Sequence, residues 1–241
     1  MKLKKRRMIA VIFALIGVII WLVVNPASYE QEFTQAVNDG ADYAAEAVSA
    51  ENPDAPLATE VLEKLEVKGR APKTDYSREQ FYSGWPNVDG CSLRQRIIKR
   101  EFGDSAVLEE CNVMAGEYDE PYTGKHMIFS NRDEISNGIQ IDHVVALSDA
   151  WQKGAQNLSS DERYKVATDP LNLLAVDAAA NKKKSDGDAA TWLPSNKRFR
   201  CQYVARQVSV KYKYKLWVTE AEKQAIAGVL AGCPGERAMG I

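Results

Sequence analysis

The longest apolar run of the chain, residues 8–24, limits most strongly what the chain can become. It holds seventeen residues, all apolar or glycine, and it follows a head with five lysines and arginines and no acid. As a helix it would measure about 25 Å, which is near the lower limit for crossing a bilayer. Positive charges before such a segment stay on the cytoplasmic side. The rest of the chain is therefore expected to be exported.

Two interpretations of residues 1–24 compete: a retained signal anchor and a cleaved signal peptide. The run is longer than the core of a usual signal peptide. Residues 24–28 (VNPAS) also lack small residues at both positions that cleavage requires. These features favour an anchor that holds the chain at the membrane through residues 8–24. Cleavage would instead give a secreted protein.

The four cysteines agree with an oxidising compartment. Cys91, Cys111, Cys201 and Cys233 are separated by 20, 90 and 32 positions and contain no C-x-x-C pair, so structural zinc is disfavoured. An even count outside the cytoplasm indicates two disulfides. Three pairings exist, and we favour the two local ones, Cys91–Cys111 and Cys201–Cys233. Each would stabilise the fold by about 3 kcal/mol in the chain-entropy description.

The net charge of -2 conceals an uneven distribution. Residues 25–66 carry ten acids and one lysine, whereas residues 182–215 carry ten lysines and arginines and two aspartates. The acidic segment is rich in alanine and poor in large apolar side chains, so we expect a stalk over residues 25–68 and a globular domain over 69–241. A hydrophobic content of 45% is ordinary for a globular protein and excludes collagen-like, disordered and multi-span membrane classes.

Periodicity within the domain predicts an α+β fold. Residues 138–145 alternate and are β-branched, as in a strand, and residues 170–176 form a second short apolar strand. The interval 148–168 is expected to be helical. Asp177 can cap a helix that begins at Ala178. Towards the C-terminus an apolar stripe predicts a helix over 201–216, and Thr219 with Glu222 forms a capping box for a last helix.

The strand and helix pattern places a small set of chemically active side chains together. Of two histidines, His126 lies in an ordinary loop or edge context, whereas His143 follows Asp142 at the end of a strand. Asn172 belongs to the second strand and Asn181 lies one turn into the following helix. Asp142 and Asn181 offer hard oxygen ligands for Mg²⁺ or a similar ion. His143 points to the opposite face from Asp142 and can take a proton from water, while Asn172 would hold the imidazole or its loop.

The chain also resembles a known family in five sequence segments. These are GCSLR at Gly90, PYTGK at Pro121, IDHVVALSDAWQKGA, DPLNLLAVDAAANKKKSDGDAATWLP and YVARQVSVKYKYKLWVT. The segments are similar to those of exported HNH endonuclease-like proteins, mainly of actinobacterial origin, within the ββα-metal nucleases. The resemblance covers roughly Tyr76 to Pro234. It implies a ββα-metal (HNH, His-Me finger) core with flanking helices.

By position, the resemblance implies His143 as the general base and Asp142 and Asn181 as ligands of a divalent metal, with Mg²⁺ expected first and Mn²⁺ as an alternative. Asn172 takes the middle asparagine place of the HNH pattern, and Asn181 stands where that pattern ends in histidine. Because some ββα nucleases hold the metal with one side chain and water, Asn181 is the firmer ligand.

Four basic residues are expected to contact the substrate backbone. A charge run next to a phosphate-cleaving centre favours phosphate contacts. The residues are Lys182, Lys183 and Lys184 beside Asn181, and Arg94 in the GCSLR segment, for which a pair with a nearby carboxylate is the alternative.

The expected reaction is hydrolysis of phosphodiester bonds in DNA, with RNA as an alternative substrate. Sequence specificity should be low because no reader motif accompanies the catalytic segment, and no obligate protein partner is expected. The competing interpretation is a catalytically silent surface receptor for nucleic acid. Cell-wall hydrolysis would need paired carboxylates or an H-E-x-x-H motif, which the sequence lacks.

Overall fold

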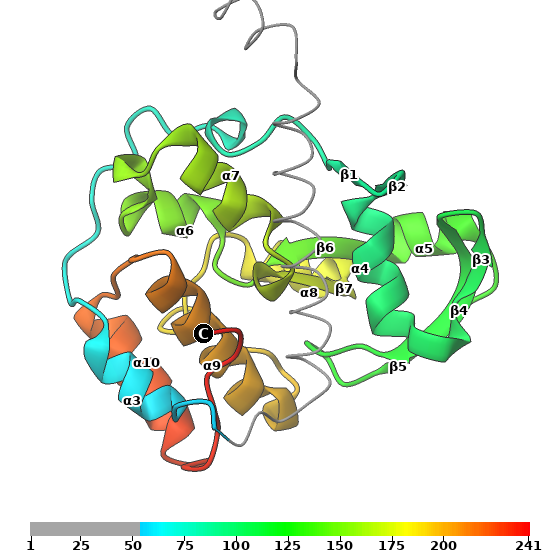
Figure 1. The fold of residues 1–241 in the computed structure, drawn as a ribbon. Helices are drawn as coiled ribbons and strands as arrows, with labels where there is room; N and C mark the ends of the chain where they lie inside the picture. Colours follow the sequence, from blue (N-terminus) through cyan, green and yellow to red (C-terminus); the bar gives the residue numbers. More distant parts are fainter. Residues whose placement is uncertain (1–53) are drawn as a thin grey trace, which may run out of the picture. The chain divides into compact units, whose positions relative to one another are not determined.

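The computed structural model describes residues 54–241. The expected membrane segment and the stalk up to residue 53 lie outside the described residues. Within residues 54–241 none of the helices has the length and apolar character needed to span a bilayer. The fold is mixed α+β, as the sequence predicts, and Figure 1 shows its elements.

The helices of the described part are short to medium in length, and 3₁₀ turns connect several of them. The α-helices are α3 (Ala58–Lys64), α4 (Leu93–Phe102), α5 (Arg132–Gly138), α6 (Leu147–Gln152), α7 (Ser160–Thr168), α8 (Ala178–Lys184), α9 (Arg200–Lys213) and α10 (Glu220–Leu230). The 3₁₀ turns are η1 (Arg78–Gln80), η2 (Gly103–Ser105), η3 (Ala155–Asn157), η4 (Pro170–Asn172) and η5 (Lys197–Phe199).

Within residues 54–241 the strands form three small antiparallel sheets. They are β1 (Asn87–Val88) with β2 (Cys91–Ser92), then β3 (Val107–Glu109), β4 (Asn112–Asp119) and β5 (His126–Phe129), and finally β6 (Ile139–His143) with β7 (Leu173–Asp177). The β6–β7 pair runs from Ile139 opposite Asp177 to His143 opposite Leu173. Both strands are mostly buried, so this pair passes through the interior.

Local capping explains where three of the helices begin. Asp177 accepts a hydrogen bond from the backbone N–H of Ala180 at 2.7 Å, which confirms it as the cap of α8. Thr219 and Glu222 form the expected capping box of α10. Ser159 and Glu162 form another at α7.

The interval expected as one helix over 148–168 is divided into α6 and α7. Gly154 lies between them with φ of 122°, a backbone conformation that side chains with a Cβ rarely adopt. A Cβ at this position would also lie 3.2 Å from the Trp217 ring. The break therefore follows from the glycine, which helical periodicity alone does not reveal.

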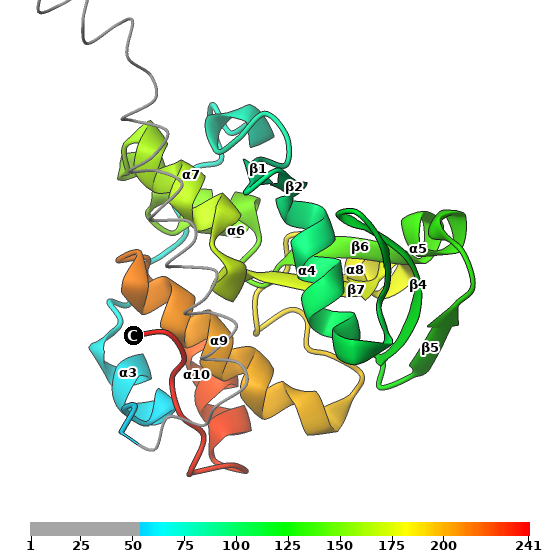
Figure 2. The same ribbon diagram turned by 45° about the vertical axis from the view of Figure 1, so that its right-hand side comes forward.

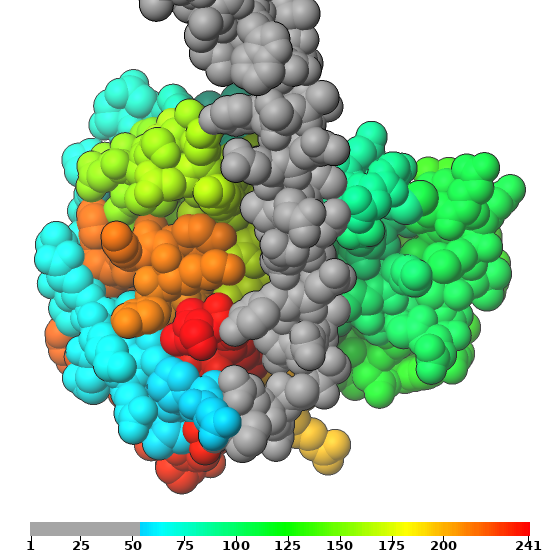
Figure 3. Space-filling view, in the orientation of Figure 1, coloured from blue at the N-terminus to red at the C-terminus, as the bar shows by residue number. Residues whose placement is uncertain are grey.

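The domain begins earlier than residue 69. Three apolar residues of α3 (Ala58, Val61 and Leu62) are buried in the main core, where α3 packs against α9 and α10. Figures 2 and 3 show α3 beside α9 and the C-terminal residues. The expected stalk over 25–68 was therefore wrong for its last part. Its apolar residues are few, but they lie on one face of a helix.

A cluster of six charged side chains connects helices α6, α9 and α10. Its members are Arg70, Asp149, Lys153, Asp188, Lys211 and Glu222. We call it the buried charge cluster. The Lys153 ammonium is fully buried and lies 2.6 Å from Asp149, 2.7 Å from Asp188 and 2.6 Å from Glu222. Three carboxylates thus face three cations, and the cluster is balanced in charge.

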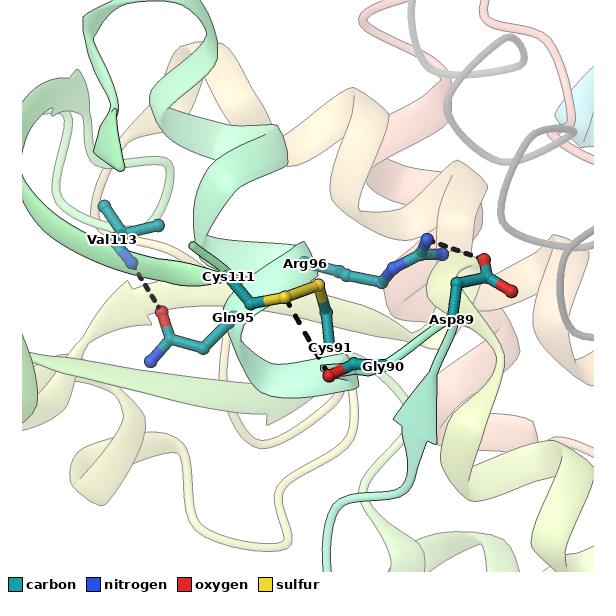
Figure 4. The surroundings of a disulfide bond; sticks show 7 residues. All are labelled: Asp89, Gly90, Cys91, Gln95, Arg96, Cys111 and Val113. Atoms are coloured by element: carbon teal, nitrogen blue, oxygen red, sulfur yellow. Dashed lines mark hydrogen bonds and ion pairs between the residues drawn. A yellow bond between two sulfur atoms is a disulfide. The ribbon is translucent and has the colours of Figure 1, made fainter. Parts of the chain in front are cut away.

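The four cysteines form the two local disulfides, Cys91–Cys111 and Cys201–Cys233. Figure 4 shows the first, which joins the strand before α4 to the turn between β3 and β4. Beside it the Gln95 side-chain oxygen accepts a hydrogen bond from the backbone N–H of Val113 at 3.0 Å. The first turn of α4 is therefore fixed to the β3–β4 hairpin.

Candidate functional site

Strands β6 and β7 and helix α8 form the frame of the candidate site. Helix α8 follows β7 directly, and it packs against both strands. At the end of β6, Asp142 and His143 stand opposite Leu174 and Leu173. This short strand–strand–helix unit brings a strand end and a helix face together, as alternation and capping in the sequence predict.

His143 is a buried imidazole held by a helix end. Its Nε2 lies 2.9 Å from the carbonyl oxygen of Ala167, in the last turn of α7. A carbonyl only accepts, so Nε2 carries the hydrogen and the neutral ring has its lone pair on Nδ1. The rings of Tyr82 and Trp85 pack on the imidazole, each with centroids 5.9 Å away.

The electrostatic surroundings keep His143 neutral. Burial lowers the pKa of His143 to about 3, and the positive charges of Arg78 and Lys184 act in the same direction. The hydrogen bond to Ala167 opposes this change but does not cancel it. Burial dominates because the imidazolium form would lose its hydration.

Asn172 organises the chain around His143 from a fully buried position. Its Oδ1 accepts the backbone N–H of Val145 at 2.8 Å, and its Nδ2 donates to the carbonyl oxygens of Val145 and Val166 at 3.3 and 3.0 Å. Val166 precedes Ala167, the acceptor of the His143 ring. Asn172 therefore ties the loop after His143 to the helix end that holds the imidazole.

Asp142 points into the interior on the other face of β6. Its Oδ1 lies 3.0 Å from the Lys184 ammonium, and its Oδ2 accepts a hydrogen bond from the Tyr122 hydroxyl. Burial raises the pKa of the Asp142 carboxyl, although Lys184 and Tyr122 act to lower it. The Asp142 carboxylate is thus part of a buried ion pair.

The position of Lys184 differs from the expected substrate contact. Its ammonium is fully buried, and it also donates to the carbonyl oxygen of His143 at 2.8 Å. It lies one helical turn after Asn181 and on the strand-facing side of α8. Lys182 and Lys183, by contrast, are exposed on the same helix.

A cavity of about 690 Å³ lies along the exposed side of this frame. We call it the histidine cavity. It brings together four of the expected site residues, Arg94, Asp142, His143 and Asn181. Asn172 and the three lysines 182–184 do not line it.

Arg94 and Asn181 are held at the wall of the histidine cavity by hydrogen bonds. The Arg94 guanidinium donates to the carbonyl oxygen of Ile139 at 3.0 Å, and it pairs with no carboxylate within residues 54–241. Burial, together with the nearby charge of Arg132, lowers the pKa of Arg94. Asn181 donates through Nδ2 to Gln140 Oε1 at 2.9 Å, which leaves its own Oδ1 for another partner.

Several cavity residues were missed at the level of sequence. Arg78 lies over the Tyr82 ring and donates to its hydroxyl at 2.7 and 3.2 Å, so its guanidinium is fixed at the cavity. Arg78 and Trp85 come from an irregular segment without periodicity, and no pattern could have selected them. Gln140 was detectable, because it lies two residues before Asp142 and therefore on the same strand face.

The oxygen donors at the histidine cavity fit a divalent cation in part. Asn181, Gln140 and Asp142 line the cavity with two amides and a carboxylate, the hard ligand types that Mg²⁺ prefers. The Gln140 oxygen already accepts from Asn181, and the two Asp142 oxygens already bond Lys184 and Tyr122. Asp142 would share its charge with Lys184, so Asn181 is the less encumbered ligand.

A second group of ligand types lies elsewhere in the described part of the chain. Cys201, Cys233 and Glu236 have candidate ligand atoms within 4.8 Å of one another, but both sulfurs form a disulfide. The sulfurs are therefore not thiolates that could bind an ion.

Comparison with known proteins places this geometry in a nuclease context. Residues 93–229 match the family described as the C-terminal domain of GmrSD restriction endonucleases. The chain belongs to this family. The GmrSD C-terminal segment includes Arg94, His143 and Asn181, whereas Arg78 and Trp85 lie before it.

One curated relative covers most of the chain. A protein of Arthroderma benhamiae named "Uncharacterized secreted protein" is 32% identical over 184 residues, which are 75% of this chain and 87% of the relative. No solved structure matches. The family supports the resemblance to nucleases, whereas neither match supports the actinobacterial type.

Proposed function

We propose that this member of the GmrSD C-terminal family is an endonuclease that hydrolyses phosphodiester bonds of DNA outside the cell membrane. One observation carries the proposal: a neutral histidine of fixed tautomer borders a cavity that also holds Asn181 and Arg94. We further propose that β6, β7 and α8 are the ββα-metal core of HNH nucleases.

His143 is the general base in this proposal. Its Nδ1 takes a proton from water as the water oxygen forms a bond to phosphorus. The bond from phosphorus to the leaving oxygen breaks, and that oxygen takes a proton from solvent. The hydrogen bond from Nε2 to Ala167 keeps the lone pair on Nδ1. General-base catalysis of this kind contributes about 10²- to 10⁴-fold in rate.

Arg94 holds the scissile phosphate, because its guanidinium faces the same cavity and is fixed by Ile139. Asn181, with Asp142, would hold a divalent ion, Mg²⁺ first. When bound, the ion supplies positive charge that stabilises the phosphate and the leaving oxygen. Asn172 positions His143 and does not touch substrate.

Low sequence specificity follows from the kind of contact. Guanidinium and ammonium groups bind the sugar-phosphate backbone, which carries no sequence information. Export is supported by the two disulfides, by the apolar run 8–24 and by the name of the Arthroderma benhamiae relative. We propose that residues 8–24 anchor the chain, with cleavage as the outcome that would make it a secreted protein.

The test uses the full-length oxidised chain with plasmid DNA and with single-stranded RNA, in Mg²⁺, in Mn²⁺ and in chelator. We expect nicking of the plasmid that chelator abolishes and that His143→Ala lowers by at least about 10²-fold. His126→Ala is the matched control, because His126 is the other histidine and its side chain is 52% exposed.

Three results would overturn parts of the proposal. Cleavage that survives both chelator and His143→Ala would refute the mechanism. Binding of DNA without cleavage would favour a receptor, and cleavage of RNA alone would reassign the substrate. Mn²⁺ binding, followed by electron paramagnetic resonance, should weaken in Asn181→Ala whether or not the chain cleaves.

A further inference from the structure

A second cavity, of about 500 Å³, adjoins the histidine cavity. We call it the Trp192 cavity. Asp186 lines both cavities, and the consecutive residues Ser185 and Lys184 line the first and the second respectively. The two hollows therefore lie on either side of the segment that follows α8.

The Trp192 cavity combines a cation, an aromatic ring and hydroxyls. Lys183 is exposed at its rim, and Thr191 and Thr219 contribute hydroxyl groups. The Trp192 ring is partly buried and packs edge-on against Tyr122 and Tyr203, with centroids 4.9 and 5.7 Å apart. A packed ring beside an exposed ammonium suits a nucleotide, whose base stacks on the ring and whose phosphate pairs with the cation.

The other charged groups of the Trp192 cavity are already balanced. Arg70 lies 2.7 Å from Asp188 and 3.2 Å from Asp149 within the buried charge cluster. Lys184 is paired with Asp142. Lys183 is therefore the cation of this cavity that can serve an incoming phosphate.

The segment between the two cavities, which contains Asp186 and Gly187, permits a polynucleotide strand to pass from one cavity to the other. In this segment Asp186 forms an ion pair with Lys73, with 3.2 Å between the ammonium and the carboxylate oxygen, and both side chains are about half exposed. Such a surface pair contributes little stability, so a phosphate can compete with Asp186 for Lys73. The Asp186 carboxylate keeps a second partner there, because Ser148 donates to it at 3.0 Å. The next residue, Gly187, approaches Lys184 closely, since a Cβ there would lie 2.9 Å from the Lys184 carbonyl oxygen.

We propose that the Trp192 cavity binds the nucleotide next to the one whose phosphodiester lies at His143, with Lys183 as its phosphate contact. The proposal rests on the proposed nuclease function and narrows its substrate to a polynucleotide strand that spans both cavities. A small isolated phosphodiester would occupy the histidine cavity alone.

Helix α8 offers a matched pair of variants. Lys182 and Lys183 are neighbours, both exposed and both positively charged, but Lys183 lines the Trp192 cavity and Lys182 lines neither cavity. Binding of a fluorescein-labelled twelve-nucleotide DNA strand is measured by anisotropy against NaCl concentration, in the full-length chain carrying His143→Ala. We expect Lys183→Ala to reduce the slope of log K against log salt by about 0.7, the value for one single-strand phosphate contact. Lys183→Arg should retain the slope, and Lys182→Ala should change it less.

A second measurement separates this inference from the nuclease proposal. In the chain with intact His143, cleavage of bis(p-nitrophenyl) phosphate should be unchanged by Lys183→Ala, whereas cleavage of the oligonucleotide should lose efficiency through KM. Equal slopes for the two alanine variants, or an equal loss on the small diester, would overturn the subsite. If the intact chain cleaves neither substrate but Lys183→Ala still lowers the slope, the nuclease proposal fails and the binding subsite stands.

Discussion

Replacement of Lys153 by methionine tests the energetic role of the buried charge cluster. The Lys153 ammonium contacts three carboxylates and has no exposed surface. Methionine retains most of the volume of the side chain but removes the charge. Three carboxylates would then face two cations, one of which, Arg70, is 35% exposed.

The expected cost is about 3–5 kcal/mol, because removal of one partner leaves an uncompensated buried charge. For a domain of this size that loss lowers Tm by roughly 6–20 °C, at about 2–4 °C per kcal/mol. It is also a large part of the roughly 5–15 kcal/mol by which domains are usually stable. A second substitution, Asp188→Asn, would rebalance the cluster and should recover part of the loss.

Urea unfolding followed by circular dichroism measures the effect, with an unchanged m-value as the sign of two-state behaviour. Lys68→Met is the control, since Lys68 is 50% exposed and pairs with Glu66 at the surface, where the loss should stay within about 1 kcal/mol. If Lys153→Met costs no more than Lys68→Met, the cluster does not stabilise the fold as argued.

Three further predictions follow from the structure. Asn172→Ala should lower the free energy of unfolding by about 1–3 kcal/mol, measured in urea, because it leaves buried backbone groups without partners. It should also reduce kcat by a larger factor than it changes KM. Unchanged kinetics would contradict the positioning role of Asn172. Replacement of both Cys91 and Cys111 by alanine should lower the free energy of unfolding by about 3 kcal/mol. It should also weaken DNA binding, since the disulfide fixes the first turn of helix α4, which carries Arg94. Normal DNA binding together with a normal Tm would contradict this. Burial alone would raise the pKa of Asp188, but Lys153 and Arg70 lower it well below its ordinary value. The ionised Asp188 therefore contributes to the free energy of unfolding above about pH 4, and this contribution is lost as the pH falls further. The urea midpoint should fall between pH 5 and pH 3, and a midpoint that rises over this interval would refute the prediction.

Local sequence signals predicted the frame of the candidate site well. The alternation before His143 and the cap at Asp177 depend on neighbouring residues alone, and both features are present in the structure. The disulfides also followed from local spacing. Features that depend on residues close together in the chain could therefore be predicted from the sequence.

Features that depend on distant partners were not accessible. In α3 a few apolar residues in an acidic segment resemble a stalk until α9 and α10 cover them. Lys184 looks like its neighbours Lys182 and Lys183, and only the helical turn directs it towards Asp142. A run of identical charges cannot show which member faces the interior.

The end of helix α7 gives the imidazole its orientation. A helix that continued would pair the Ala167 carbonyl with the backbone N–H of Leu171, four residues later. Instead, Asp169 adopts an extended conformation before Pro170, and its side chain accepts that N–H at 2.8 Å. The Ala167 oxygen is thereby left for His143. Asp169 and Pro170, which end helix α7, thus also determine the tautomer of His143. A sequence that extended α7 by one turn would engage the Ala167 carbonyl oxygen within the helix, and the His143 ring could then carry its proton on Nδ1 instead of Nε2.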